Sequence, residues 1–427
     1  VFFAWQGQWS TVSDRGIVNL MALHMAEGRA FPVFYYGQSY MGSPEPALSA
    51  LFVRLFGASG FTVALGTAIP AALLVIPLYF LGRRLGGPAA GALAAAFLAV
   101  GPDAFLAYMS SPRGGYALTL LLNVLILLVA ARLATAAWQR EPLPRRDWIA
   151  LGLLGGVGWW IGPMIAPALG AAGLVLLVAL RGRIWHPGVR WAAAAFALGA
   201  SPWLIWNAQH HWRSMSMVQT VGEVRAGEAL RLLARRTWEG LGWGAPGWSA
   251  GVTLALLLAG LLAVVGAAAW QAVRQRNRSA VWALAAVTLY LLLFGAAYSV
   301  SSFSRTETLR YVLPALPALA LLLGLGGVLL GRLHRGLLAV ALLALAGPHV
   351  YAQWKIPQPD ERRKEVEAVP EFVRQLKAAG TDAVFADYKY HWMNFAARGH
   401  LPVVEPDGDC VALNDRAGLL ARRPAYY

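Results

Sequence analysis

Charged residues and cysteine are both scarce in this chain of 427 residues. Only 13% of the residues are charged, whereas 58% are hydrophobic and come in long uninterrupted runs. Such runs are typical of a polytopic helical membrane protein and argue against an ordinary soluble domain. Because Cys410 is the single cysteine, neither a disulfide within the chain nor a cysteine-based metal site is possible.

Signals for nucleotide or nucleic-acid binding are also lacking. No glycine-rich phosphate loop follows a predicted strand, so we expect no nucleotide site. A net charge of +15 would elsewhere suggest nucleic acid as a partner. Here the basic residues form short arginine clusters between apolar runs, as cytoplasmic loops do. We therefore expect membrane lipids, and no nucleic acid, as partners.

Apolar segments of spanning length predict an all-α polytopic membrane protein with about eleven transmembrane helices. The first is interpreted as a truncated remnant at residues 1–5, "VFFAW", without a signal peptide. The other spans are expected at residues 61–82, 87–102, 116–131, 149–161, 164–180, 191–206, 250–270, 280–303, 311–330 and 336–352. Gly162 and Pro163 are expected to break the chain between two short helices. Arginine clusters fall in every second loop, and the positive-inside rule assigns these loops to the cytoplasm.

Four larger pieces then fall on the outer face: residues 6–60, 103–115, 207–249 and everything after 353. The first outer loop, 6–60, is expected to carry two amphipathic surface helices, and 207–249 one more. Composition changes at residue 353, after which all four lysines lie. We therefore expect a transmembrane domain at 1–352 and a small, incomplete α/β domain at 353–427 on the outer face. Its strands are expected in "DAVFADY" and "LPVVE".

Ionisable residues are missing from the predicted spans. No Asp, Glu, Lys or Arg occurs inside any of them. This argues against an ion-coupled transporter, because such proteins need ionisable groups at membrane depth. The ionisable residues gather instead on the predicted outer face, where a reaction at the membrane interface would use them. They are Asp14, Glu45, Asp103, Arg113, His210, His211, Arg213, Arg305, Glu307 and Arg310.

Several stretches occur in a characteristic order: "SDRG", "GRAFPVFYYGQSYMGSPEPALSALFVRLFG", "PLYFLGRRLGG", "ALGASPWLIWN" and "SSFSRTETLRYVLPALPALALL". In this order they resemble the C-type (GT-C) membrane glycosyltransferases, particularly glycosyltransferase family 39, the protein mannosyltransferases, and the bacterial aminoarabinose transferases. The C-terminal "DAVFADYKYHWMNFAARGHLPVVEP" is similar to the outer domain that such proteins often carry. The resemblance covers nearly the whole chain.

The resemblance implies an inverting enzyme of a bacterial-type inner membrane that works at the outer face. It would transfer a sugar from a polyprenyl-phosphate carrier to a protein, lipid or glycan acceptor, with apolar grooves between spans holding the prenyl tail. The acceptor hydroxyl needs a general base, and the departing phosphate needs cations nearby. No cofactor is expected. A divalent metal requirement and membership in a larger membrane complex are left open.

The resemblance also assigns roles to particular residues. Asp14 matches the acid of the first outer loop and is the expected base, with Glu45 as a second catalytic candidate. Arg310 and Tyr311 match the "RY-LP" motif and are expected to bind the lipid phosphate. The remaining candidates are Arg113 and Arg305 for the phosphate, and Tyr35, Tyr36, Gln38 and Tyr40 for the sugar or acceptor. No metal ligands are assigned, since the adjacent His210 and His211 lack metal-ligand spacing.

The first loop departs from the family pattern at two places. Arg15 stands where many relatives have a second acid, and "GSPEP" replaces a "KPPL"-like segment whose lysine can contact the carrier phosphate. These departures suit a divergent carrier or acceptor. They also leave two alternatives open: a catalytically silent accessory subunit with this fold and, less favoured, a transporter of lipid-linked sugars. Asp14 would then be a helix N-cap, Glu45 a turn residue and Arg310 a snorkelling side chain.

Overall fold

The computed structural model describes residues 13–183, 185–216, 226–240, 250–301 and 309–336, with isolated helical positions and three short strands further on. Most of these residues are helical, so the predicted helical architecture is confirmed. The chain divides into two compact units. The first comprises residues 1–70, 107–116 and 357–427, and the second residues 71–106 and 117–356.

The first unit is built on two short helices, α2 (Ser13–Ala26) and α3 (Pro44–Phe56), which pack against each other. Proline at the first position of α3 suits a helix start, because an N–H there would have no partner within the helix. A tight connection joins the two helices, in which Tyr35 N–H donates to Met41 O at 2.8 Å. The beginning of α4 (Gly60–Leu73) belongs to the same unit.

The apolar face of α2 is buried inside the protein. Its residues, all at most 9% exposed, are Ile17, Leu20, Met21 and Met25. The sequence predicted that this face would lie in the membrane interface. The structure instead packs most of it into a core with α3 and Val63, because the two helices are close enough to bury each other. The outward side of α3 keeps an interfacial character, since Leu51, Leu55 and Phe56 are exposed.

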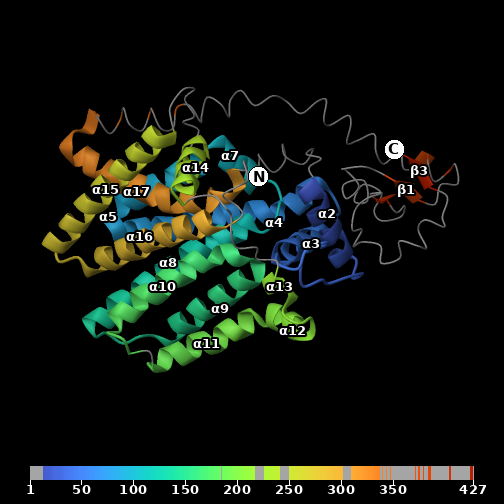
Figure 1. Ribbon diagram of the computed structural model, residues 1–427, viewed down its shortest axis with the longest axis horizontal. Helices are drawn as coiled ribbons and strands as arrows, with labels where there is room; N and C mark the ends of the chain where they lie inside the picture. The colour runs from blue at the N-terminus through green and yellow to red at the C-terminus, as the bar shows by residue number, and fades with distance from the viewer. Residues whose placement is uncertain are drawn as a thin grey trace. The chain divides into compact units, whose positions relative to one another are not determined.

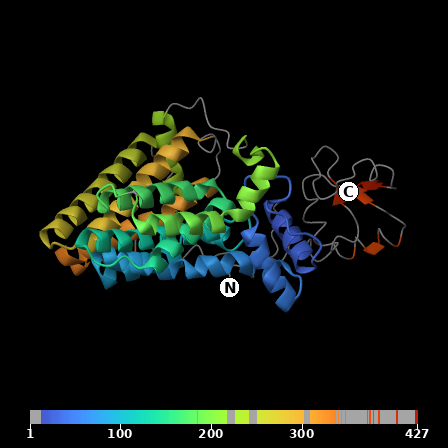
Figure 2. The ribbon, with the colours of Figure 1, turned by 90° about the horizontal axis from the view of Figure 1, so that it is seen from below.

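From α5 on, the helices belong mainly to the second unit. They are α5 (Val75–Gly86), α6 (Pro88–Val100), α7 (Asp103–Met109), α8 (Tyr116–Gln139), α9 (Arg145–Ile161), α10 (Ala166–Ala179), α11 (Pro187–Gly199), α12 (Ser201–Gln209), α13 (Arg213–Ser216), α14 (Ala226–Gly240), α15 (Ala250–Arg274), α16 (Arg278–Val300) and α17 (Leu316–Leu333). The predicted helix within 207–249 corresponds to α14. Figure 1 shows α8 to α11 side by side, and the view in Figure 2 shows the helices of this unit sharing one general direction.

Small residues let α9 and α11 pack closely against each other. A Cβ atom on Gly152 would overlap the carbonyl oxygen of Ala192, and one on Gly156 would overlap that of Phe196. Glycine at both positions therefore lets the two backbones approach, as small residues do at many helix contacts in membranes.

A buried tyrosine links three segments of the second unit. Tyr290 of α16 donates its hydroxyl hydrogen to Pro314 O at 2.7 Å, and it accepts a hydrogen bond from Asn123 Nδ2 at 3.2 Å. Pro314 and Pro317 lie where the last long span begins with 3-10 turns rather than with an α-helix. Proline favours such a start because it has no N–H for an α-helical hydrogen bond.

Four described helical stretches are long and apolar enough to cross a membrane: Gly60–Gly86, Tyr116–Gln139, Arg278–Val300 and Leu309–Arg332. They are accompanied by three shorter apolar helices: Pro88–Val100, Pro163–Ala179 and Leu258–Arg274. The expected pair of short helices on either side of Gly162 is confirmed by α9 and α10. The total of about eleven spans stays a prediction, because residues 1–5 and most of 336–352 lie outside the described residues.

Three short strands belong to the C-terminal region: β1 (Ala383–Phe385), β2 (Val403–Val404) and β3 (Pro424–Tyr426). They form a parallel sheet with β1 in the centre. β1 and β2 fall within the two strands expected from the sequence, whereas β3 adds a strand that the sequence pattern did not indicate. Most of 353–427 lies outside the described residues, so the α/β domain as a whole stays a prediction.

Candidate active site

The first unit arranges polar groups around one buried carboxylate, that of Glu45. Glu45 lies in the first turn of α3 and is 1% exposed. Tyr35 Oη donates a hydrogen bond to Glu45 Oε2 at 2.9 Å, and Gly114 N–H donates to the same oxygen at 3.2 Å. Gly115 N–H and Thr67 Oγ1 donate to Oε2 and Oε1, respectively. Four donors thus converge on a single side chain.

These contacts make Glu45 an anchor rather than an open base. Solvent barely reaches the carboxylate, so an acceptor hydroxyl would have to displace one of its donors. The carboxylate ties α3 to α4 and to the backbone amides at 114–115, which directly precede α8. This geometry supports a positioning role for Glu45, and its catalytic role stays a prediction.

Tyr35 is enclosed to a similar degree, with 4% of its surface exposed. Burial raises the pKa of its phenol well above the ordinary value, and the charge of Glu45 adds to this effect, with Asp14 contributing last. The phenol is therefore protonated near neutral pH and acts as a donor to Glu45. Its ring presents little open surface, and its expected contact with a sugar or acceptor stays a prediction.

Tyr36, Gln38 and Tyr40, which follow Tyr35 in the sequence, are more exposed to solvent than Tyr35. Tyr36 Oη lies 2.8 Å from His24 Nδ1. Burial raises the pKa of Tyr36 to about 12, while burial and then the charge of Arg29 lower the pKa of His24, so both groups are neutral near pH 7. Gln38 and Tyr40 are half-buried, and Gln38 Oε1 has no hydrogen-bond partner. Gln38 is thus a polar group with capacity for a ligand.

Asp14 lies in the first turn of α2 and is half-buried. A carboxylate is favourable there because the N-terminal end of a helix carries partial positive charge. Its charge acts on Tyr35, whose pKa it helps to raise, which places it in electrostatic reach of the Glu45 cluster. Asp14 is therefore the more accessible of the two expected catalytic carboxylates.

Arg15 is a residue of this region that the sequence did not assign to the site. It is completely buried, and its Nη2 donates to Gly60 O at 2.9 Å, while Nε and Nη1 have no hydrogen-bond partner within the described part of the chain. Burial, and then the charge of Arg113, lower the pKa of Arg15 to about 9. The signal in the sequence was an arginine directly beside the expected base, where many relatives have an acid.

Arg113 is the expected phosphate ligand that lies in the first unit. It is half-buried, its Nε donates to Ser111 Oγ at 3.3 Å, and its guanidinium carbon lies 4.9 Å from the centre of the Tyr108 ring. It directly precedes Gly114, so Glu45 holds the backbone beside it. Asp14, Arg15, Glu45 and Arg113 are thus brought together in one compact unit.

The other expected phosphate ligands lie elsewhere in the chain. Arg310 and Tyr311 belong to the second unit, in the 3-10 turn η3 (Leu309–Tyr311). The guanidinium carbon of Arg310 lies 5.0 Å from the centre of the Tyr311 ring. Arg305 lies outside the described residues. The roles of all three stay predictions.

A metal centre is not formed within the part of the chain that the structure describes: no three His, Cys, Asp or Glu side chains there could share an ion. His210 instead stacks on Trp206, with ring centroids 4.1 Å apart, and its Nδ1 lies 2.7 Å from Trp206 O. A requirement for a divalent metal stays open.

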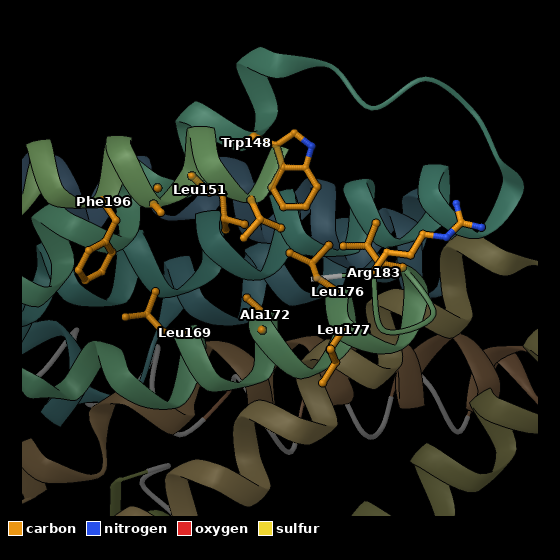
Figure 3. Close-up of a pocket in the computed structure, with 14 residues that line it drawn as sticks. Trp148, Leu151, Leu169, Ala172, Leu176, Leu177, Arg183 and Phe196 are labelled. Carbon is orange, nitrogen blue, oxygen red and sulfur yellow. The ribbon is translucent and has the colours of Figure 1, made fainter. Parts of the chain in front are cut away.

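An apolar cavity of about 510 Å³ lies among α9, α10 and α11 of the second unit (Figure 3). Apolar side chains and glycines form its walls, and Arg183 stands at one end. The labelled residues in Figure 3 are Trp148, Leu151, Leu169, Ala172, Leu176, Leu177, Arg183 and Phe196. Its size lies within the range of ligand pockets, and its lining suits a hydrocarbon chain. Grooves of this kind are what the sequence led us to expect between the spans.

Comparisons with known proteins match residues of both units. Residues 45–206 match the family model for dolichyl-phosphate-mannose-protein mannosyltransferases. No curated protein matches the chain by sequence. Among solved structures, ArnT from Cupriavidus metallidurans in the apo state superposes with a TM-score of 0.64 at 14% identity, over 99% of this chain and 87% of ArnT. The resemblance to the GT-C glycosyltransferases is confirmed.

The GT-C fold is shared with two further structures. ArnT from the same organism, bound to undecaprenyl phosphate, has a TM-score of 0.64 at 15% identity, over 97% of this chain and 86% of its own. The oligosaccharyltransferase AglB from Archaeoglobus fulgidus, in complex with an inhibitory peptide and a dolichol-phosphate, has a TM-score of 0.51 at 14% identity. That match covers 92% of this chain and 60% of AglB. At such identities the matches show a common fold.

Proposed function

We propose that this protein is a glycosyltransferase that moves a sugar from a polyprenyl-phosphate carrier to a protein, lipid or glycan acceptor. The observation that carries the proposal is the GT-C fold along nearly the whole chain, shared with an ArnT that binds undecaprenyl phosphate. The family model matched by residues 45–206 supports a lipid-linked donor. We expect the reaction at the outer face of a bacterial-type inner membrane, because the ionisable groups gather in the loops opposite the arginine clusters.

Asp14 is the proposed general base. An alcohol is a poor nucleophile at neutral pH, so a nearby carboxylate that accepts its proton accelerates the attack. The acceptor oxygen bonds to the anomeric carbon of the sugar while the bond from this carbon to the phosphate oxygen breaks. The proton passes to Asp14 and the electron pair to the carrier phosphate. Attack from the face opposite the phosphate inverts the configuration of the sugar.

The departing phosphate gains negative charge and needs cations beside it. Arg310 and Tyr311, Arg113 and Arg305 are the proposed ligands. Glu45 is proposed to act through Arg113, since it holds the amides of the next two residues. Gln38, with its unpartnered Oε1, is a proposed contact for a sugar hydroxyl, together with Tyr40, Tyr36 and Tyr35.

The substitution Asp14→Asn tests the proposal in proteoliposomes that contain a radiolabelled undecaprenyl-phosphate sugar. We expect sugar transfer to fall by at least about a hundredfold, because loss of a general base removes that much or more. Binding of the carrier should remain. Glu27→Gln changes an exposed-loop acid of the same unit that pairs with Arg29 and should leave transfer unchanged. Transfer by Asp14→Asn at the wild-type rate would contradict the proposed base.

A second candidate function, a catalytically silent subunit with the GT-C fold, draws support from Glu45. This acid of the first loop is fully engaged with four donors, and Arg15 stands where relatives have another acid. Such a subunit would co-purify with other membrane proteins in a larger complex. It would transfer no sugar from any polyprenyl-phosphate donor, even in the wild-type form.

A further inference from the structure

Arg15 is a buried cation that has no counter-ion among the residues that the structure describes. None of its surface is exposed, and of its guanidinium nitrogens only Nη2 has a partner, the carbonyl oxygen of Gly60. Nε and Nη1 are left without one. A charged group taken out of water is unfavourable unless it is paired and hydrogen-bonded. A buried polar group left unsatisfied calls for a specific explanation, and a bound ion or ligand is one of them.

The carboxylate of Asp14 directly precedes Arg15 in the chain, but the charge that acts on the pKa of Arg15 is positive. Arg113 is the charged group found to act on Arg15, and it has the same sign. Arg15 also sits in the first turn of α2, where the helix end is itself positive and disfavours a cation. The carboxylate of Glu45 is already engaged with its four donors. Two guanidinium groups and a helix N-terminus therefore share one small region.

The sequence of the first loop indicates which phosphate ligand Arg15 and Arg113 could replace. "GSPEP" lacks the lysine with which relatives can contact the carrier phosphate, and Arg15 stands where many of them have an acid. The positive charge needed for a phosphate is present in the loop, but at a different position.

We propose that Arg15, together with Arg113, binds the phosphate of the lipid carrier. This inference rests on the proposed function and names the residues that replace the missing lysine. A guanidinium offers several donors in a plane and can bind phosphate oxygens in pairs. Arg15 is enclosed without ligand, so the phosphate has to enter beside the half-buried Arg113 and open the contact with Nε and Nη1 of Arg15. Glu45 is then a positioning residue, because it fixes the backbone that follows Arg113.

The substitution Arg15→Met tests the site, because methionine is apolar and unbranched and leaves no buried charge. In the absence of ligand we expect its thermal midpoint to equal or exceed that of the wild type. Its affinity for undecaprenyl phosphate, measured by native mass spectrometry in detergent, should fall about ten- to a hundredfold. Arg15→Lys should keep part of the affinity. Arg54→Met, at an exposed arginine of α3 in the same unit, should change neither quantity.

Two results would overturn the inference. One is a lowered thermal midpoint of Arg15→Met with unchanged carrier affinity, which would make Arg15 a structural residue that holds Gly60. The other is loss of affinity to the same degree in Arg54→Met, which would reflect general surface charge. If the wild type transfers sugar in either case, the proposed function stands while the phosphate site fails.

Inorganic phosphate as the probe distinguishes failure of the proposed function from failure of the anion site at Arg15. If the wild type neither binds nor uses undecaprenyl phosphate, the proposed function fails. Inorganic phosphate that raises the thermal midpoint of the wild type, but not of Arg15→Met, would then still support an anion site at Arg15. Equal shifts in both proteins, or none in either, would overturn it.

The cavity among α9, α10 and α11 supports a second, separate inference. The cation beside it, Arg183, is exposed, whereas Arg15 is buried. Arg183 is exposed at one end of the apolar walls, and in Figure 3 its guanidinium extends away from them. Its guanidinium makes no hydrogen bond or ion pair with any described residue, and only its backbone is hydrogen-bonded, to Leu180 and His186. Along α10 and its C-cap the lining runs from Leu169 to Leu180, roughly 16 Å at about 1.5 Å per residue. The cavity thus has the form of a slot for a hydrocarbon chain with a cation at its end.

Positive charge dominates this end of the helices. The arginines there lie at the starts of α9 and α11 and after α10: Arg145, Arg146, Arg181, Arg183 and Arg190. Asp147 is the acid among them, and it already pairs with Arg132 at 3.1 Å and with Arg146 at 3.7 Å. We infer that an anionic membrane phospholipid binds here, with an acyl chain in the cavity and its phosphate beside Arg183.

Nanodiscs of phosphatidylglycerol mixed with phosphatidylcholine test this second site. We expect the wild type to retain phosphatidylglycerol preferentially in native mass spectrometry, and Arg183→Gln to lose about fivefold of that preference. Arg274→Gln, at an exposed arginine of α15, is the control. Gly173→Phe should reduce retention of either lipid, since a Cβ atom there meets nothing within 4 Å and the ring can enter the cavity. No preference in the wild type, or loss of undecaprenyl phosphate instead of phospholipid in Gly173→Phe, would overturn the inference.

Discussion

The Glu45 cluster of the first unit and the α9–α11 cavity of the second are built from different kinds of contact. Around Glu45, buried polar groups are matched donor to acceptor, and the guanidinium of Arg15 is enclosed beside them with a single partner. Around the cavity, apolar side chains and glycines set the distance between helices. Polar changes should therefore act most strongly in the first region, and changes of volume in the second.

The largest effect should follow from Glu45→Ala in the first unit. The substitution leaves Tyr35, Thr67 and two backbone amides as buried donors without an acceptor, which we expect to cost about 3–5 kcal/mol of stability. Thermal unfolding in detergent measures the loss. Glu27→Ala removes an ion pair that is partly exposed to solvent and should cost less than about 0.5 kcal/mol. A similar small loss in Glu45→Ala would remove the contrast between the two regions.

A change of volume should have the next largest effect, in the second unit. Gly156→Leu would drive a side chain into the carbonyl oxygen of Phe196 and force α9 and α11 apart. We expect a loss of about 1–3 kcal/mol, as for other overpacked contacts. Gly173→Leu adds the same side chain where a Cβ atom meets nothing within 4 Å, and it should be nearly neutral. Equal melting temperatures for the two variants would show that packing distance does not matter here.

The buried charge of Arg15 should give the first unit a dependence on pH. Burial and then the charge of Arg113 lower the pKa of Arg15 to about 9. Above this value the unfolded chain still holds a proton that the folded chain has released, so stability rises with pH. Without phosphate, we expect the wild type to gain roughly 1 kcal/mol from pH 9 to 10 relative to Arg15→Met. Denaturation curves at pH 8, 9 and 10 that run parallel for both proteins would contradict this.

The fold was predictable from the sequence where hydrophobicity alone decides it. The long apolar runs predicted membrane-spanning helices, and Gly162 with Pro163 predicted the break between α9 and α10. The burial of the apolar face of α2 was not predictable, because an amphipathic helix shows the same pattern whether it covers a membrane or a neighbouring helix. The structure provides α3 as the partner. The close contact of α9 with α11 also depends on which glycines face each other, and composition does not reveal this.

The sequence predicted which residues belong to the candidate site, but not how they are arranged. The sequence identified Asp14, Glu45 and Arg113 as polar residues of the predicted outer face. It could not show that Glu45 is saturated by donors, two of which are backbone amides nearly seventy residues away. The same limit applies to Arg15, because a departure from a family pattern does not tell whether the side chain is exposed or buried. Burial and hydrogen-bond partners come only from the folded chain.

The smallest effect expected concerns the polar pair at the margin of the Glu45 cluster. Tyr36→Phe removes the hydrogen bond with His24 Nδ1 and should cost about 0.5–1 kcal/mol at pH 7, because both side chains are only half-buried. Burial, followed by Arg29, lowers the pKa of His24, so the unfolded chain takes up a proton first as the pH falls. Stability should therefore decline below about pH 6.5 in the wild type. Tyr36→Phe should keep this decline, since burial is its main cause, whereas His24→Gln should abolish it. Melting curves at pH 7 and 5 distinguish the loss of a hydrogen bond from the loss of a titrating group.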